Sequence, residues 1–275
     1  SINGDLSGLN VCIDCANGAS AAVARQLFPR LGAKCTFIGV EPDGKNINAG
    51  VGSTHLDNLE KAVVEGGFDC GIAFDGDADR CLACDEKGQE IDGDKVIALL
   101  AMNMKEKGCL DGNTAVVTVM SNLGFIKFME SQGIHTEKTA VGDRYVLENM
   151  RENGYAIGGE QSGHVILLHH ATTGDGELTA GKKMSELNGI YAQYPQVLVN
   201  VVANAAQKAA YKGDKVLADF IENEQQKLMD MGRVLVRVSG TEPKIRVMVE
   251  GQDLEAIDLC AKRIVDKINE RIIEG

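Results

Sequence analysis

The sequence contains no tryptophan and only four prolines among 275 residues. So few prolines argue against a Pro-rich linker. Positive charge is also scarce, because 28 Lys and Arg residues oppose 40 Asp and Glu residues and give a formal net charge of −12. Nucleic-acid binding draws on clustered basic side chains. The charge balance therefore disfavours a nucleic-acid partner.

Long apolar runs are absent as well. The longest strongly apolar run covers residues 97–102, and the sequence does not open with a basic region followed by an apolar stretch. A helix needs about 20 apolar residues to span a bilayer. We therefore expect no membrane segment and a cytoplasmic location.

Eight cysteines include two C-x-x-C pairs, at 12 and 15 and at 81 and 84, whose pattern superficially resembles a zinc site. Each pair lies in an apolar, strand-like run, in which a period of two turns its members toward opposite faces. The gap between the pairs also exceeds the usual spacing of zinc ligands. We expect reduced, partly buried thiols.

Glycine is abundant, with 32 residues, in a composition of 44% hydrophobic and 25% charged residues that is typical of a globular protein. Strand and helix patterns alternate, restart near residue 114, and give way to a different pattern near the C-terminus. We predict an α/β fold: two consecutive α/β domains with mixed, largely parallel sheets, followed by a small α+β C-terminal domain. The expected bounds are 1–108, 109–195 and 196–275.

The acidic loop, residues 75–80, follows an apolar strand pattern and places Asp75, Asp77 and Asp79 at alternate positions. Three close carboxylates repel one another unless they are protonated or neutralised. Oxygen ligands of this kind suit Mg²⁺. A calcium EF-hand does not fit, because Arg80 occupies the position that requires glycine. A solvated acidic turn is the alternative.

The glycine loop, residues 158–164, lies between two strand patterns and contains three glycines. Its turns direct Glu160, Gln161, Ser162 and His164 toward a common space, which suits a polyhydroxylated ligand. An exposed glycine-rich turn is an equally good interpretation of this motif by itself.

The basic hairpin, residues 237–246, joins two strand patterns in the C-terminal segment. Hydroxyl groups, backbone N–H groups and cations there are able to surround a phosphate; they belong to Arg237, Ser239, Gly240, Thr241, Lys244 and Arg246. A plain hairpin with solvated cations is the alternative. A further phosphate candidate, Arg144, follows Asp143, which we expect to cap a helix.

The three motifs in this order resemble the α-D-phosphohexomutase superfamily over essentially the whole chain. Gln161, together with the segments 42–44, 46–48 and 52–55, favours its phosphoglucosamine branch. The resemblance implies a phosphoserine that donates its phosphoryl group to a hexosamine phosphate. Glucosamine 6-phosphate and glucosamine 1-phosphate would then interconvert through a bisphosphate. It also implies a possible homodimer of the full-length enzyme.

The same resemblance implies individual roles. Asp75, Asp77 and Asp79 would hold Mg²⁺, and Arg80 would stabilise the charge in transfer. The sugar would contact Glu160, Gln161, Ser162 and His164. The non-reacting phosphate would contact Arg237, Ser239, Gly240, Thr241 and Arg246, with Arg144 as a further candidate.

Two departures from the family qualify these expectations. The reactive serine lies in a first domain that this sequence does not contain, so we expect the missing N-terminal domain to be a partner and the chain to be inactive alone. Two to three helical turns also look absent between Ala180 and Gly181. The rival interpretations are a haloacid-dehalogenase-type phosphatase, with Asp75 as nucleophile, and a non-catalytic sugar-phosphate-binding fragment.

Overall fold

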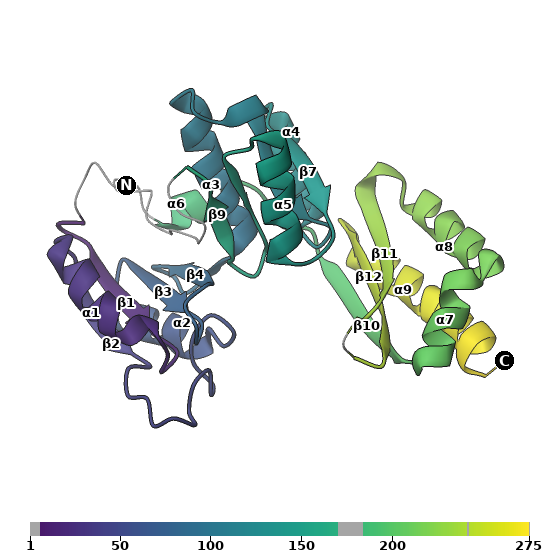
Figure 1. Cartoon of the computed structure of the whole chain (residues 1–275), viewed down its shortest axis with the longest axis horizontal. Coiled ribbons are helices and arrows are strands. Elements are labelled where there is room, and N and C mark those ends of the chain that lie inside the picture. The colour runs from purple at the N-terminus through teal and green to yellow at the C-terminus, as the bar shows by residue number, and fades with distance from the viewer. Residues whose placement is uncertain (1–5, 170–183, 241, 275) are drawn as a thin grey trace. The chain divides into compact units, whose positions relative to one another are not determined.

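The computed structural model describes residues 6–169, 184–240 and 242–274. It divides into two compact units. Unit 1 comprises Ser1–Ser121 and Phe125–Ala192, and unit 2 comprises Asn122–Gly124 and Gln193–Gly275. Unit 1 holds two sheets and unit 2 holds one (Figure 1).

The first sheet of unit 1 has the strand order β2-β1-β3-β4-β5. Strand β1 pairs in parallel with β2 and β3, whereas β4 and β5 are antiparallel additions. Helices α1 and α2 cover its two faces (Figure 1). The bounds are β1 Asn10–Asp14, α1 Ser20–Arg30, β2 Lys34–Ile38, α2 Asp57–Gly66, β3 Cys70–Phe74, β4 Cys81–Asp85 and β5 Glu90–Ile91.

Side chains alternate across this sheet as the sequence predicts. Cys15 packs with Val11 in the cluster that contains the buried side of α1, whereas Cys12 packs in the cluster under α2. All eight cysteines are free thiols. Burial raises the pKa of the Cys12 thiol to about 11, with a smaller contribution from the charge of Asp14, so this thiol stays protonated at neutral pH.

The second sheet of unit 1 has the order β7-β6-β8-β9, with β6 parallel to β7 and β8 and β9 antiparallel. Helix α3 packs through Ile97 and Leu100 into the core of this sheet, and α5 packs on a second cluster through Val146 and Met150. The bounds are α3 Gly93–Glu106, β6 Thr114–Thr118, α4 Leu123–Ser131, β7 His135–Thr139, α5 Asp143–Asn153, β8 Ile157–Gly159, β9 Val165–Leu167 and α6 Met184–Asn188.

Unit 2 is an antiparallel sheet, β10-β12-β11, packed against helices. An apolar stripe of α9 packs on this sheet, because Ile257, Ala261, Ile264 and Ile268 are buried in one cluster with Val247. The bounds are β10 Gln196–Val202, α7 Ala205–Gly213, α8 Lys215–Leu228, β11 Gly232–Val238, β12 Lys244–Gly251 and α9 Leu254–Ile268, with a π-helical turn at Asn269–Ile273.

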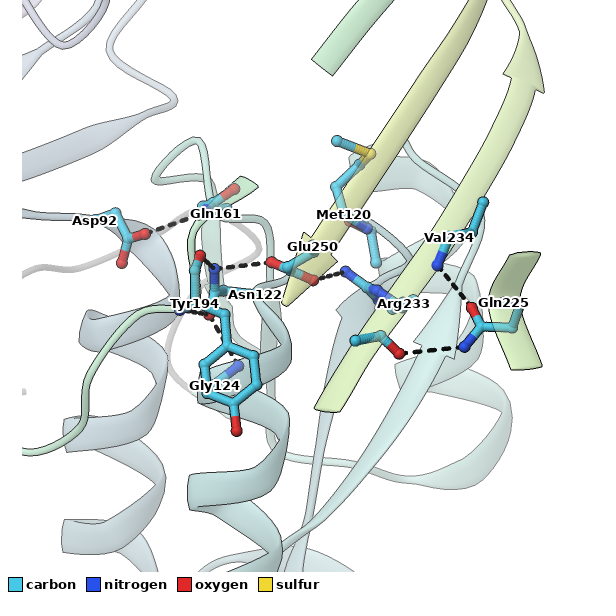
Figure 2. Close-up of polar contacts among 12 residues, drawn as sticks. Asp92, Met120, Asn122, Gly124, Gln161, Tyr194, Gln225, Arg233, Val234 and Glu250 are labelled. Carbon is cyan, nitrogen blue, oxygen red and sulfur yellow. Dashed lines mark hydrogen bonds and ion pairs between the residues drawn. The ribbon is translucent and has the colours of Figure 1, made fainter. Parts of the chain in front are cut away.

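A buried carboxylate lies in unit 2, that of Glu250 on β12 (Figure 2). It accepts from Arg233 at 2.8 Å and from the side-chain amide of Asn122 at 2.8 Å. Burial raises the pKa of Glu250, and the charge and hydrogen bond of Arg233 only partly oppose that rise.

The predicted fold class is confirmed, whereas one local expectation is wrong and one helix was not predicted. Asp143 is the first residue of α5 and makes no capping hydrogen bond, because Gly142 occupies the N-cap. Helix α7 was not expected, although Asn204 and Gln207 form a capping box at its start. The three-domain bounds stay a prediction, and the junction of Ala180 and Gly181 lies outside the described residues. No described helix combines the length and apolarity that a membrane span requires.

Candidate functional site

The acidic loop follows β3 and closes on itself. The Arg80 backbone N–H and its Nε donate to the two oxygens of Asp75, at 3.1 and 2.7 Å, and Asp75 is fully buried. Ala78 has a φ of 64°, which turns the loop. One carboxylate oxygen from each of Asp75, Asp77 and Asp79 lies within 4.8 Å of the others. The structure therefore brings the three predicted metal ligands together.

The electrostatics of the loop favour a cation. Burial would raise the pKa of Asp75, but the hydrogen bonds and charge of Arg80 outweigh it and the pKa is lowered. Burial, reinforced by the charges of Asp75 and Asp77, raises the pKa of Asp79. A buried oxygen of Asp79, Oδ1, accepts no hydrogen bond among the described groups, although Arg80 Nε lies 3.5 Å away. One arginine thus opposes three carboxylates, and this donor set fits Mg²⁺.

Neighbouring segments of the chain pack tightly around the acidic loop. A Cβ at Gly18 would lie 2.3 Å from the carbonyl oxygen of Gly76, and a Cβ at Gly76 would lie 2.6 Å from Ile47. The segment 46–48 therefore packs against the loop.

Asp14, at the end of β1, holds two of the loops that surround this region. Its two oxygens accept from the backbone N–H groups of Ala16 and Gly52, at 2.9 and 2.8 Å, and its side chain is fully buried. Sequence reasoning missed Asp14. The available signal was a carboxylate at the carboxyl end of a buried strand.

The glycine loop adjoins the acidic loop within unit 1. The carbonyl oxygen of Gly163 accepts from the N–H of Cys81 at 3.0 Å. His164 is buried, and its Nδ1 lies 3.4 Å from Oδ2 of Asp79. Gly163 has a φ of 94°, and a Cβ there would lie 2.5 Å from the carbonyl oxygen of Cys81, so only glycine permits this approach.

Two side chains of the glycine loop have fixed orientations. Gln161 donates to Asp92 at 3.0 Å (Figure 2), and the other oxygen of Asp92 caps α3 by accepting from the N–H of Lys95. Glu160 accepts from the N–H of Gly142 at 3.0 Å. Ser162 is exposed. Sequence reasoning missed Asp92, whose capping position before a helix was the one local signal.

Arg144, the further phosphate candidate, lies on the surface of α5. Its side chain is 80% exposed, and its Nε donates to Glu148 one turn later at 2.7 Å. Arg144 therefore forms an exposed ion pair within α5.

The basic hairpin lies in unit 2, between β11 and β12. Arg237 and Arg246 are direct partners on the two strands. Ser239 is buried, and its Oγ accepts from the N–H of Glu242 at 3.1 Å. Gly240 is exposed, and Thr241 lies outside the described residues. Sequence reasoning missed Lys208 of α7, which donates to the carbonyl oxygens of Ser239 and Glu242 at 2.6 and 3.0 Å.

An apolar cavity of about 400 Å³ opens beside the acidic loop in unit 1. Val23, Leu27 and Phe28 of α1 line it together with Asp79 and Arg80. The side chains of Val23 and Leu27 are 63% and 44% exposed. Some apolar side chains of α1 therefore remain exposed beside the face that packs on the first sheet.

Comparison with protein families assigns almost the whole chain to one family. Residues 3–88 match the model described as phosphoglucomutase/phosphomannomutase, alpha/beta/alpha domain II. Residues 92–208 match alpha/beta/alpha domain III, and residues 178–267 match the C-terminal domain of the same family.

Curated relatives agree with this match. A phosphoglucosamine mutase of Acetivibrio thermocellus is 51% identical over 281 residues, which cover 98% of this chain and 63% of the relative. One of Streptomyces avermitilis is 51% identical over 273 residues, which cover 96% of this chain and 60% of the relative. The chain thus spans about three fifths of the length of these relatives. The phosphatase alternative is not favoured by these matches.

Solved structures share the fold. A phosphoglucomutase/phosphomannomutase family protein from Burkholderia thailandensis has a TM-score of 0.78 at 20% identity and covers 99% of this chain and 62% of its own. The Aspergillus fumigatus N-acetylphosphoglucosamine mutase, in complex with GlcNAc-6P and magnesium, has a TM-score of 0.76 at 18% identity and covers 97% of this chain and 67% of its own. With three family domains matched in order, the chain belongs to the phosphoglucomutase/phosphomannomutase family.

Proposed function

We propose that this chain supplies the metal-, sugar- and phosphate-binding parts of a phosphohexomutase that interconverts glucosamine 6-phosphate and glucosamine 1-phosphate. The observation that carries the proposal is the identity of about half of the aligned residues to phosphoglucosamine mutases. The clustered carboxylates of the acidic loop support it independently.

In this proposal Asp75, Asp77 and Asp79 hold Mg²⁺, which when bound neutralises negative charge on the phosphoryl group. Arg80 is fixed beside them by its contact with Asp75 and stabilises charge that develops during transfer. Phosphoryl transfer depends mainly on positioning and on charge stabilisation. In this proposal the four side chains supply both.

We assign the sugar to the glycine loop. The orientation of Glu160 by Gly142 and of Gln161 by Asp92 means that these groups lose little freedom when they bind hydroxyl groups. Ser162 is exposed and available to a ligand, and His164 links this loop to Asp79.

The non-reacting phosphate is assigned to the basic hairpin, where Arg237, Ser239, Gly240, Thr241 and Arg246 would surround it. Arg144 is retained only as a secondary candidate, because Glu148 already holds its guanidinium.

The proposed partner is a serine-bearing first domain, and the apolar cavity beside the acidic loop is its proposed contact surface. A phosphoserine must reach Asp75, Asp77 and Asp79, and the exposed apolar side chains of α1 border the same cavity. Homodimerisation of the full-length enzyme and a cytoplasmic location belong to the same proposal.

The test is complementation in trans. The purified 275-residue chain, mixed with the recombinant first domain of a phosphoglucosamine mutase and Mg²⁺, should convert glucosamine 6-phosphate to glucosamine 1-phosphate, whereas the chain alone should not. The substitutions Val23→Gln and Leu27→Gln should raise the concentration of first domain needed for half-maximal turnover by about tenfold. Leu259→Gln, at a 54% exposed site on α9, is the matched control.

The outcomes separate the alternatives. Turnover by the chain alone would contradict the proposal that a first domain is required for activity. Calorimetric binding of glucosamine 6-phosphate without turnover in the mixture would identify a non-catalytic sugar-phosphate-binding fragment. Equal effects of the α1 and α9 substitutions would show that the docking surface does not lie at the cavity beside α1.

A further inference from the structure

The basic hairpin contains its own counter-ion. Glu242 Oε1 accepts from Lys244 Nζ at 2.8 Å, and Glu242 Oε2 accepts from a terminal nitrogen of Arg246. The cations of Lys244 and Arg246 lower the pKa of Glu242, so the carboxylate is ionised at neutral pH. Two of the cations around the turn are therefore engaged by this carboxylate.

The backbone of the turn does not depend on that carboxylate. Lys208 bridges the carbonyl oxygens of Ser239 and Glu242 from α7. The N–H of Ser239 donates to the carbonyl oxygen of Lys244 at 2.9 Å, and the N–H of Glu242 donates to Ser239 Oγ. The Glu242 side chain is thus free to leave its partners while the hairpin keeps its shape.

Positive charge remains in excess even with Glu242 in place. Arg237 directly faces Arg246 across the ladder, and among the described residues Arg237 makes no ion pair. Partial burial, followed by the charge of Arg246, lowers the pKa of Arg237. Nε of Arg246 is buried and has no hydrogen-bond partner among the described groups. Two facing arginines with spare donors suit an anion with several oxygens.

We propose that Glu242 is a displaceable counter-ion, which holds Lys244 and Arg246 until a phosphate dianion takes its place. The inference rests on the proposed phosphate role of this hairpin. The Glu242 side chain is 39% exposed, and ion pairs of such exposure are weak, so a dianion is able to compete with it. Because phosphate must first displace Glu242, its affinity is lower than it would be at a hairpin without this carboxylate. A singly charged anion that displaces Glu242 brings no more negative charge than the carboxylate it replaces, so the hairpin discriminates against such anions.

Calorimetry on the full 275-residue chain tests this role with inorganic phosphate and with glucosamine 6-phosphate as probes. Glu242→Gln should bind both about fivefold more tightly than the unsubstituted chain, because the competing charge is gone; this corresponds to about 1 kcal/mol. A merely structural role for Glu242 predicts weaker binding instead. Glu222→Gln, which removes an exposed carboxylate of α8 in the same unit, is the charge-matched control and should change affinity by less than about twofold.

Arg237→Gln separates this inference from the function on which it rests. If Arg237→Gln weakens phosphate binding and Glu242→Gln tightens it, the counter-ion role is supported. If Arg237→Gln weakens binding while Glu242→Gln leaves it unchanged or weaker, the hairpin binds phosphate but the counter-ion role is overturned. If phosphate binding is undetectable in every variant, or is unaffected by Arg237→Gln, both the phosphate assignment and the inference are overturned.

Discussion

The acidic loop of unit 1 and the basic hairpin of unit 2 have opposite charge but the same electrostatic organisation. In the first, Arg80 contacts Asp75 and Asp79 within a cluster of three carboxylates, and His164 lies 3.4 Å from Asp79. In the second, Glu242 lies among Lys244 and Arg246, with Arg237 opposite. Each cluster keeps an excess of one sign, and each is therefore suited to a ligand of the other sign: a divalent cation in one case and a phosphate in the other.

The two loops differ in what fixes their shape. The acidic loop is enclosed by neighbouring backbone and side-chain atoms so close that Gly18, Gly76 and Gly163 leave no room for a Cβ. Around Gly240 of the basic hairpin a Cβ would meet nothing within 4 Å, and Lys208 holds the turn. Steric fit therefore determines the first geometry, whereas hydrogen bonds to a charged side chain determine the second.

The largest expected effect tests this steric difference. Gly163→Ala should reduce the free energy of unfolding of the chain by about 3 kcal/mol, because a side chain there combines an unfavourable φ with a clash against the carbonyl of Cys81. Gly240→Ala should change it by less than about 0.5 kcal/mol. Urea unfolding followed by circular dichroism measures both. Similar losses at the two glycines would contradict the distinction.

A smaller effect is expected for the charge of the acidic loop. Asp77 is exposed, so Asp77→Asn should leave the fold intact while it removes the charge of one proposed metal ligand. We expect Mg²⁺ affinity, measured by calorimetry, to fall by on the order of tenfold. Asp57→Asn, at an exposed acidic site on α2, controls for net charge. A metal affinity that falls equally in both variants would show a diffuse electrostatic effect in place of ligation.

The smallest expected effect concerns Glu250, whose pKa is raised mainly by burial. Because the pKa of Glu250 is raised in the folded chain, the folded state binds more protons than the unfolded state between the ordinary and the raised pKa. This carboxyl therefore contributes stability below its ordinary pKa that is lost as pH rises through the raised value.

Denaturant unfolding of the chain and of Glu250→Gln between pH 4 and pH 8 isolates this contribution. The free energy of unfolding of the unsubstituted chain minus that of the variant should decrease with rising pH. An increasing difference would mean that Arg233 outweighs burial and that the pKa of Glu250 is lowered.

Much of this organisation was predictable from local sequence. The alternation of strand and helix patterns predicted the fold class, and the spacing of Asp75, Asp77 and Asp79 predicted that their carboxylates meet, because alternate residues of a tight turn lie close together whatever surrounds them. The roles assigned to these residues remain proposals.

The missed residues share a different property. Asp92 contacts Gln161 across 69 positions, and Lys208 contacts Ser239 across 31. No local pattern reports such pairs. Helix α7, which carries Lys208, was missed because none of its residues is buried, so the apolar periodicity that identifies a helix is absent.

The sequence by itself determined which chemical groups this protein offers and in what order: carboxylates, then a glycine loop rich in hydrogen-bonding side chains, then cations beside hydroxyl groups. Only the tertiary structure decided how these groups are held. The opposition of Arg237 to Arg246, the support of Gln161 by Asp92 and the contact of His164 with Asp79 depend on which strands and loops become neighbours. That choice is made by packing of the whole core, since burial of apolar surface outweighs any single polar contact.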